Sequence, residues 1–178
     1  MEPPINKVGL CTVIVDGVAA PLVLLVQPKG KRADPNDPPP YVLPRGTRAY
    51  AASDGTWHDA RTKEDAIAHA EALEPLDATM KREAEEEAGI PPALFTNQAY
   101  RELGVRRYTS PNKPPYDVYW GVLTLSLEDR ALLSMPVDSQ DMQWVTLAEF
   151  EQMVAAGTAR AGYLEIARES ISSSHHRH

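Results

Sequence analysis

Three glutamates lie close together in residues 82–90, a stretch whose composition predicts the end of a helix. A helix advances about 100° per residue, so Glu83, Glu86 and Glu87 fall on one arc, whereas Glu85 points away from them. A stripe of small and apolar residues runs beside that arc at a spacing of four: Leu76, Met80, Ala84 and Ala88. The spacing therefore predicts three carboxylates that converge at the edge of a buried helix face.

Gathering these carboxylates costs free energy. Like charges four residues apart destabilise a helix by about 0.2–0.5 kcal/mol per pair, and the helix dipole disfavours each acidic residue in the last turns by about 0.3–1 kcal/mol. A divalent cation would offset the repulsion, because hard cations such as Mg²⁺ bind carboxylate and phosphate oxygens. Taken alone, the glutamate run is more typical of a solvated acidic surface, so the neighbouring residues must decide between the two interpretations.

Those neighbours resemble the signature of the Nudix hydrolases. The residues that match the second half of this signature are Arg82, Glu83, Glu86, Glu87 and Gly89. Glu74 stands where the signature has its first glutamate, with seven residues between it and the arginine. The Leu-Pro-Arg-Gly stretch at 43–46 is similar to the family's Leu-Pro-x-Gly motif, and residues 143–145 are similar to its last strand. The resemblance covers most of residues 8–156.

One departure from the family pattern concerns the glycine of the signature. The family places it six residues before the first glutamate, where this chain has Ala68. Gly46 is the equivalent glycine, so residues 47–73 replace a five-residue spacer and are expected to be an insertion of 22 residues (27 in place of 5). The insertion could be a helical flap over the site or a passive excursion, and both remain open. Its His58 and His69 are expected to be surface residues rather than metal ligands.

The resemblance implies a metal site. In Nudix hydrolases, metal ions bridge the box carboxylates and the diphosphate of the substrate while water attacks one phosphorus; such ions neutralise charge and lower the pKa of bound water. Mg²⁺ or Mn²⁺ is therefore expected, held by Glu83, Glu86 and Glu87, with the backbone carbonyl near Arg45 or Gly46 as a further ligand.

The catalytic roles implied by the same resemblance fall on four residues: Glu86, Glu83, Arg82 and Asp138. One carboxylate would accept a proton from the attacking water, and Arg82 would orient a box carboxylate. Asp138 is the downstream acid we favour because it precedes the strand that holds Trp144. Asp141 and Glu128 are alternatives, and each of the three could equally be a plain loop acid.

Substrate contacts are less well defined by the sequence. Basic residues near the signature and on a later strand with its loop could steer phosphates: Arg45, Arg48, Arg101, Arg106, Arg107 and Lys113. Arg45, Arg48 and Arg106 are the candidates for substrate contacts. A tyrosine in the region of Tyr108 is found in relatives that hydrolyse diadenosine polyphosphates, where an aromatic ring can stack on a base. Solvated basic residues and a strand tyrosine are the alternative interpretations.

The elements that must position these residues follow from hydrophobic patterning. Strands are predicted at residues 8–15, 21–27, 99–108, 116–125 and 142–146, and the first two form a hairpin. Helices are predicted at residues 60–73, 75–88, 147–156 and 160–171. Residues 28–40 and 47–59 are expected to be irregular, and residues 172–178 a disordered tail. This order predicts an α/β protein: a Nudix-like α/β/α sandwich with a mixed sheet.

Length and charge limit the remaining possibilities. A chain of 178 residues fits one domain, 1–178, with a core at about 8–156. No apolar run is long enough to span a membrane, no secretory signal is evident, and the single Cys11 excludes an internal disulfide, so a cytoplasmic protein is expected. The net charge of -7 argues against a nucleic-acid partner but allows a small nucleotide. A homodimer is compatible with the sequence.

The most favoured function is therefore metal-dependent hydrolysis of the pyrophosphate linkage in a nucleoside-diphosphate-linked substrate, such as a dinucleoside polyphosphate or a (d)NTP. The alternative is a non-catalytic module that binds a nucleotide and regulates a partner on the same fold, because fold alone does not fix activity. A helical interaction domain with an acidic face ranks last, since it leaves the motif at 43–46 unexplained.

Overall fold

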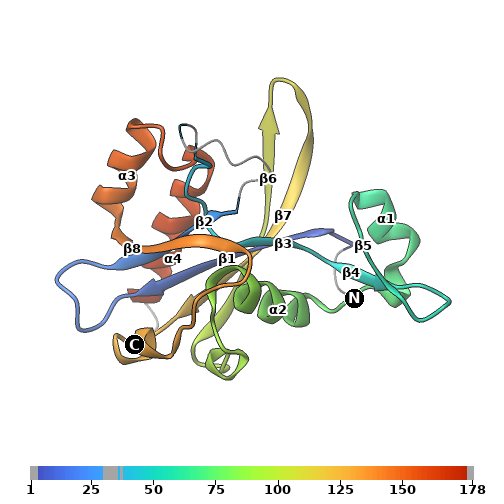
Figure 1. Cartoon of the computed structure of the whole chain (residues 1–178), viewed down its shortest axis with the longest axis horizontal. Helices are drawn as coiled ribbons and strands as arrows, with labels where there is room; N and C mark the ends of the chain where they lie inside the picture. Colours follow the sequence, from blue (N-terminus) through green and yellow to red (C-terminus); the bar gives the residue numbers. More distant parts are fainter. Residues whose placement is uncertain (1–3, 30–35, 37, 176–178) are drawn as a thin grey trace.

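A mixed six-stranded sheet forms the centre of the protein in the computed structural model, which describes residues 4–29, 36 and 38–175 (Figure 1). Five strands are ordered β6-β7-β1-β2-β8, and β3 pairs with β1. Their bounds are β1 Lys7–Ile14, β2 Leu22–Pro28, β3 Arg45–Thr47, β6 Tyr100–Ser110, β7 Lys113–Thr124 and β8 Ser139–Thr146. Only the β1–β7 pairing is parallel among these strands of the described chain.

Strand β1 lies in the middle of the sheet and is buried on both faces. Its even-numbered residues Val8 and Leu10 contact Met80 of α2 (Leu76–Ala88). The odd-numbered Cys11 lies against Ser170 of α4 (Leu164–His175) on the opposite face. Since alternate side chains of a strand point to opposite faces, α2 and α4 must cover different sides of the sheet.

The two helical layers confirm the predicted α/β/α sandwich. Figure 1 shows α2 on one side of the sheet and α4 with α3 (Leu147–Ala155) on the other. Helix α2 follows Pro75 and ends at Gly89, whose left-handed φ of 63° suits a residue without a Cβ. Helix α3 begins with a capping box between Thr146 and Glu149. None of the described helices is long and apolar enough to cross a membrane.

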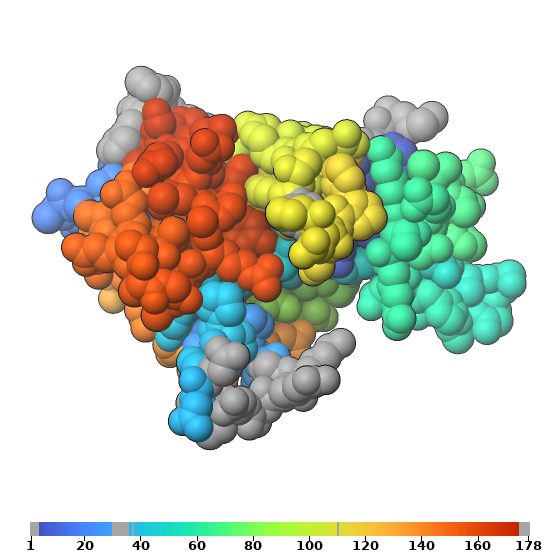
Figure 2. Space-filling view, turned by 90° about the horizontal axis from the view of Figure 1, so that it is seen from above, coloured from blue at the N-terminus to red at the C-terminus, as the bar shows by residue number. Residues whose placement is uncertain are grey.

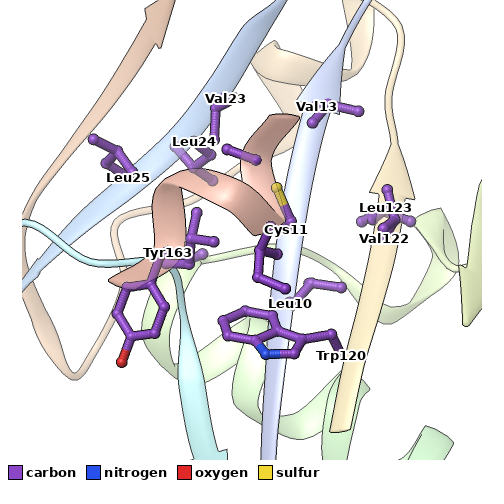
Figure 3. Packing of buried hydrophobic residues seen from close by; sticks show 14 of the residues in the cluster. Leu10, Cys11, Val13, Val23, Leu24, Leu25, Trp120, Val122, Leu123 and Tyr163 are labelled. Carbon is purple, nitrogen blue, oxygen red and sulfur yellow. The ribbon is translucent and has the colours of Figure 1, made fainter. Parts of the chain in front are cut away.

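The core extends over β1, β2 and β7 and includes residues of both α2 and α4, and Figure 3 shows part of it. Trp120 of β7 is fully buried, and its ring lies 5.5 Å from that of Tyr163. Gly9 allows this packing, because a Cβ there would lie 2.4 Å from the indole. Cys11 is also completely buried, and burial raises the pKa of its thiol to about 12. It is therefore a core residue.

Residues 47–73, the predicted insertion, differ from expectation. Residues 47–59 are not irregular but contain β4 (Ala49–Ala51) and β5 (Trp57–Asp59), which form a separate two-stranded antiparallel sheet. The helix predicted at 60–73 is shorter: α1 covers Lys63–Ala68, and a 3₁₀ turn follows at Ala70–Ala72. The alanine-rich composition resembles a long helix, but the capping box between Thr62 and Asp65 starts the helix later.

The C-terminal region also needs correction. The helix predicted at 160–171 begins later, with a 3₁₀ turn at Ala161–Tyr163 followed by α4. Of the tail predicted to be disordered, residues 172–175 belong to α4, and residues 176–178 lie outside the described residues. Ser170 and Ser174 are buried, and their hydroxyls donate to backbone carbonyls one turn earlier. The serine-rich residues at the end of α4 can therefore be buried in a helix, because these hydroxyls have hydrogen-bond partners within it. Most of the predicted loop at 28–40 also lies outside the described residues.

Candidate active site

Helix α2 carries three carboxylates to the edge of an open groove of about 490 Å³. Leu76, Met80, Ala84 and Ala88 are buried, as the spacing of four predicted. Glu83, Glu86 and Glu87 line the groove, whereas Glu85 is exposed elsewhere on the helix. The structure therefore has the predicted arrangement, in which one face of the helix is buried and three glutamates lie together at its edge.

Arg82 links the glutamates of the signature to one another. Its guanidinium donates to both carboxylate oxygens of Glu74, at 3.0 and 2.8 Å. It also donates to Glu83 at 2.9 Å and to Glu86 at 3.4 Å. A further hydrogen bond of 3.0 Å reaches the carbonyl of Thr47 on β3. Arg82 thus fixes the carboxylates relative to β3 and is a positioning residue, as expected from the resemblance.

Gly46 lets β3 approach α2. A Cβ at this position would lie 1.9 Å from Cδ of Glu83 and 2.1 Å from its Cγ, closer than any side chain can tolerate. The backbone at residues 45–47 therefore lies directly against the Glu83 carboxylate. Gly46 also lines the groove, and a role for its carbonyl as a metal ligand stays a prediction of the resemblance.

The loop before β8 brings a fourth carboxylate to the groove. The N–H groups of Ser134 and Asp138 donate to the carbonyls of Gly89 and Glu86, at 3.0 and 2.9 Å. The hydroxyl of Ser139 donates to the carbonyl of Glu87 at 2.5 Å. These bonds satisfy carbonyls that the end of a helix leaves free, so the loop and α2 hold each other in register.

Asp138 consequently lines the groove with the three glutamates. The two alternative acids do not line it. Asp141 accepts a hydrogen bond from the Tyr41 hydroxyl, and Glu128 lies in a 3₁₀ turn at Glu128–Leu132. Of the three acids considered, the structure places only Asp138 beside the glutamates.

Burial and repulsion raise the pKa of two of the carboxyls. Loss of solvation, together with the charge of Glu86, raises the pKa of Glu83 to about 7 against the opposing effect of Arg82. Loss of solvation also raises the pKa of Glu87 to about 7, and the charges of Glu83 and Asp138 add to it. The pKa of Glu74 shifts the other way. Burial alone would raise it, but hydrogen bonds from Arg82 and Thr79 hold the pKa below its usual value. The groove thus concentrates negative charge that a cation would relieve.

The donor set fits a hard divalent cation. All four acidic side chains offer oxygen, the ligand atom that Mg²⁺ and Mn²⁺ prefer. Among the described residues, no group of three or more acidic, histidine or cysteine side chains is arranged so that it could by itself hold a metal ion. Mg²⁺ does not require such a group, because it is commonly bound through one or two carboxylates, waters and substrate phosphates. Glu83, Glu86 and Glu87 line the groove and would supply part of such a coordination shell, completed by water and substrate phosphates.

The basic residues divide into two groups. Arg45 lines the groove, and its guanidinium lies 5.3 Å from the centre of the Tyr163 ring. Arg48 does not reach the groove: it is only 2% exposed, and it donates to the carbonyls of Glu74 and Ile5 at 2.9 and 3.1 Å. The prediction that Arg48 binds substrate is therefore wrong, because its guanidinium is buried and donates to backbone carbonyls within the protein.

Arg106 and Tyr108 also lie away from the groove. Arg106 forms an ion pair of 2.6 Å with Glu169 of α4. The Tyr108 ring packs beside Tyr116 and Tyr163, at 5.5 and 6.0 Å between ring centres, so it belongs to an aromatic cluster on the α4 side. Neither residue lines the groove, because Arg106 is paired with α4 and the Tyr108 ring packs among other aromatic rings.

Sequence reasoning missed three residues that line the groove: Lys7, Thr47 and Asp59. Lys7 donates to the Thr47 hydroxyl at 2.9 Å, and burial together with the nearby Arg45 lowers its pKa. Its position at the start of a strand, directly before an apolar run, was the available signal. Asp59 ends β5, a strand that was not predicted, so no sequence signal placed it.

Several solved structures share this architecture, although no protein-family model and no curated protein sequence matches the chain. A NUDIX hydrolase from Alicyclobacillus acidocaldarius has a TM-score of 0.58 and 14% identity, over 94% of this chain and 91% of that one. The NUDIX domain of Shewanella oneidensis NrtR, complexed with ADP ribose, has a TM-score of 0.57 and 14% identity, over 97% and 90%. A C. elegans Ap4A hydrolase has a TM-score of 0.51 and 17% identity, over 96% and 98%. The chain therefore has the Nudix fold.

Proposed function

We propose that this protein is a Nudix hydrolase that cleaves the pyrophosphate linkage of a nucleoside-diphosphate-linked substrate with Mg²⁺ or Mn²⁺. The observation that carries the proposal is the meeting of Glu83, Glu86, Glu87 and Asp138 in one groove, opposite Arg45. The fold neighbours support it, since one is a hydrolase of Ap4A and another binds ADP ribose. Candidate substrates are dinucleoside polyphosphates and (d)NTPs.

The chemistry follows from the charge of the reactants. A diphosphate resists attack because its negative oxygens repel a nucleophile; metal ions bound at Glu83, Glu86 and Glu87 would neutralise that charge and activate water. Lys7 and Arg45 lie where they can bind the outer phosphate oxygens and orient the diphosphate. Water adds to one phosphorus, the bridging P–O bond breaks, and the bridging oxygen leaves with the other phosphate.

The proton of the attacking water needs a carboxylate acceptor. Glu86 and Asp138 are the available candidates, because Glu86 is 40% exposed and Asp138 lies in the exposed loop across the groove. Glu83 is more deeply buried, at 12% exposure, and is bound to Arg82, which suits a ligand better than a base. Comparing Asp138→Asn with Glu86→Gln would assign the role.

A second candidate function is nucleotide binding without turnover. The observation that favours it is the similarity to the NrtR domain complexed with ADP ribose. The complete set of signature carboxylates favours the enzyme, because a binding module needs no group to activate water. The two functions differ in a single measurable property, the release of product.

The test is a panel of nucleoside-diphosphate-linked compounds incubated with Mg²⁺, with Mn²⁺ and with a chelator, in which phosphate and nucleotide release are measured. We expect metal-dependent cleavage of one compound class. Glu86→Gln and Glu87→Gln should each lower turnover by at least about a hundred-fold, because glutamine is a poor ligand and cannot neutralise the metal. Circular dichroism should show an unchanged fold.

Glu85→Gln is the matched control, since it removes the same charge from the exposed side of the same helix. It should retain wild-type turnover. Full activity in the Glu86 and Glu87 variants would contradict the site. Tight nucleotide binding without cleavage of any compound would replace the enzyme with the binding module.

A further inference from the structure

A second hollow lies beside the groove and is larger, at about 610 Å³. Its walls are the start of α1, the β6–β7 hairpin and the beginning of β1. Figure 2 shows the hairpin and the 47–73 segment facing each other across a depression in which the start of the chain is visible. A volume of this size is typical of a site for a small molecule, roughly 300–1,000 Å³.

The hollow is positively charged in an acidic protein. Its lining holds five basic side chains, Lys7, Arg61, Lys63, Arg107 and Lys113, and two acidic ones, Glu64 and Asp117. This is a surplus of three positive charges in a chain whose net charge is -7. We call this hollow the basic cleft. A local positive field of this kind attracts small anions even when the whole molecule repels them.

Part of this charge is already neutralised and part is not. Asp117 forms ion pairs with Arg107 at 3.1 Å and with Lys63 at 3.7 Å, so it joins the hairpin to α1. Arg61 and Lys113 are exposed and have no acidic partner within the described part of the chain. These two cations, one on each wall, are therefore available to an anionic ligand.

The basic cleft adjoins the catalytic groove through Lys7, which lines both. Its ammonium donates to the Thr47 hydroxyl and is influenced by the charges of Asp59 and Glu83 in the groove. Ile5 and Asn6, which directly precede β1, line the cleft. A ligand that begins at the carboxylates can thus pass Lys7 and continue between the two walls.

From this geometry we infer that the basic cleft binds a phosphate-bearing part of the substrate that lies beyond the scissile diphosphate. The inference rests on the proposed function for the identity of the ligand. It gives the 47–73 segment a role, because α1 supplies one wall of the cleft. It also predicts a preference for substrates with more than two phosphates over compounds that carry only the scissile pair.

The experiment compares Arg61→Gln/Lys113→Gln with wild type. Both side chains are exposed, so the fold should be retained. In chelator, calorimetry with inorganic tripolyphosphate should show binding to wild type that the double variant weakens about ten-fold, the size expected for two partly exposed ionic contacts. Arg130→Gln/Arg168→Gln is the control, because it removes the same charge from exposed positions that line neither hollow, and it should bind as wild type does.

Kinetics provide the second arm. With Mg²⁺, the Arg61→Gln/Lys113→Gln variant should raise KM for a dinucleoside tetraphosphate about ten-fold, with kcat unchanged, while KM for a two-phosphate nucleotide sugar stays within about two-fold. Equal tripolyphosphate binding by wild type and this variant would overturn the inference. An equal loss in the control pair would also overturn it, because net charge would then be the cause. Normal tripolyphosphate results without any hydrolysis would instead refute the proposed function and leave the basic cleft in place.

Discussion

At the scale of single residues, the groove depends on how closely two backbone segments approach. Arg82 draws Glu74, Glu83 and Glu86 together, and Gly46 leaves room for Glu83 at the strand beside them. Neither residue has to touch the substrate. Each acts by placing a carboxylate, so a change in either should alter the site without removing any charge from the glutamates.

Gly46→Ala tests this arrangement. The added methyl group overlaps the Glu83 carboxyl, so Glu83 must move and its bond to Arg82 must lengthen. We expect turnover to fall by about ten- to a hundred-fold, the usual effect of disturbing the support of a metal ligand. The Mg²⁺ concentration for half-maximal activity should rise, and both quantities come from one metal titration.

Gly162→Ala is the control for the added methyl group. A Cβ at position 162 would lie 3.9 Å from the Tyr108 ring, an ordinary contact distance, and the residue is outside the groove. This variant should keep wild-type kinetics. If Gly46→Ala were as active as Gly162→Ala, the close approach of β3 to Glu83 would have no functional meaning.

The site residues that were predicted from the sequence are those tied to a local repeat or motif. Glu83, Glu86 and Glu87 were placed together by the period of a helix, and that period holds within one element. Arg48 was misjudged for the opposite reason. Nothing near it in the sequence signals burial, and the carbonyls it binds belong to Ile5 and Glu74, far from it along the chain.

At the scale of elements, too, the predictions succeeded where a pattern lies within one segment and failed where the structure depends on distant segments. The first hairpin, α2 and the long strands β6 and β7 were found because their patterns are strong within a single segment. The β4–β5 pair was missed because each strand has only three residues, too few to establish alternation. The parallel pairing of β1 with β7 joins segments about a hundred residues apart, and no local pattern encodes that register.

The 47–73 segment is anchored to the main sheet by buried polar contacts. Arg48 donates to the carbonyls of Ile5 and Glu74, and the Asn6 amide donates to the carbonyl of Ala60 at 3.0 Å. The segment also pairs with β1 through β3, whose last residue is Thr47. These contacts fix its start and its end, which is what a wall of the basic cleft requires.

Arg48→Met should therefore lower the free energy of unfolding by about 2–4 kcal/mol. The substitution keeps much of the volume but leaves the buried carbonyl of Ile5 and the partly buried carbonyl of Glu74 without this donor, and an unsatisfied buried carbonyl costs about 1–3 kcal/mol. Urea denaturation followed by tryptophan fluorescence measures the change. Arg130→Met, at an exposed position, should stay within about 0.5 kcal/mol of wild type. A loss below 1 kcal/mol in Arg48→Met would mean that water replaces the guanidinium.

At the scale of the whole molecule, charge is distributed unevenly. The chain carries 25 acidic and 18 basic side chains, yet both hollows combine basic residues with specific acidic ones. In the groove, burial raises the pKa of Glu83 and Glu87 to about 7, and the neighbouring acidic side chains add to the shift. The folded protein therefore retains electrostatic repulsion that a bound cation would remove, which couples metal binding to stability.

Mg²⁺ should accordingly stabilise the folded protein. A ligand present at a hundred times its Kd, and bound only by the folded state, adds about 2.7 kcal/mol. For a chain of this size that corresponds to a rise in Tm of roughly 5–10 °C. Unfolding removes the helical geometry that aligns Glu83, Glu86 and Glu87 and separates them from Asp138, so the unfolded chain offers no comparable site. Thermal unfolding with increasing MgCl₂ measures the shift, and NaCl at equal ionic strength corrects for screening.

Variants identify where that stabilisation arises. Glu86→Gln/Glu87→Gln removes two ligands and relieves the repulsion, so it should be at least as stable as wild type without Mg²⁺ and should gain little when Mg²⁺ is added. Glu85→Gln should respond as wild type does, because its side chain is exposed away from the groove. An equal Mg²⁺ shift in all three proteins would place the ion elsewhere. The absence of any shift in wild type would contradict a metal site at the groove.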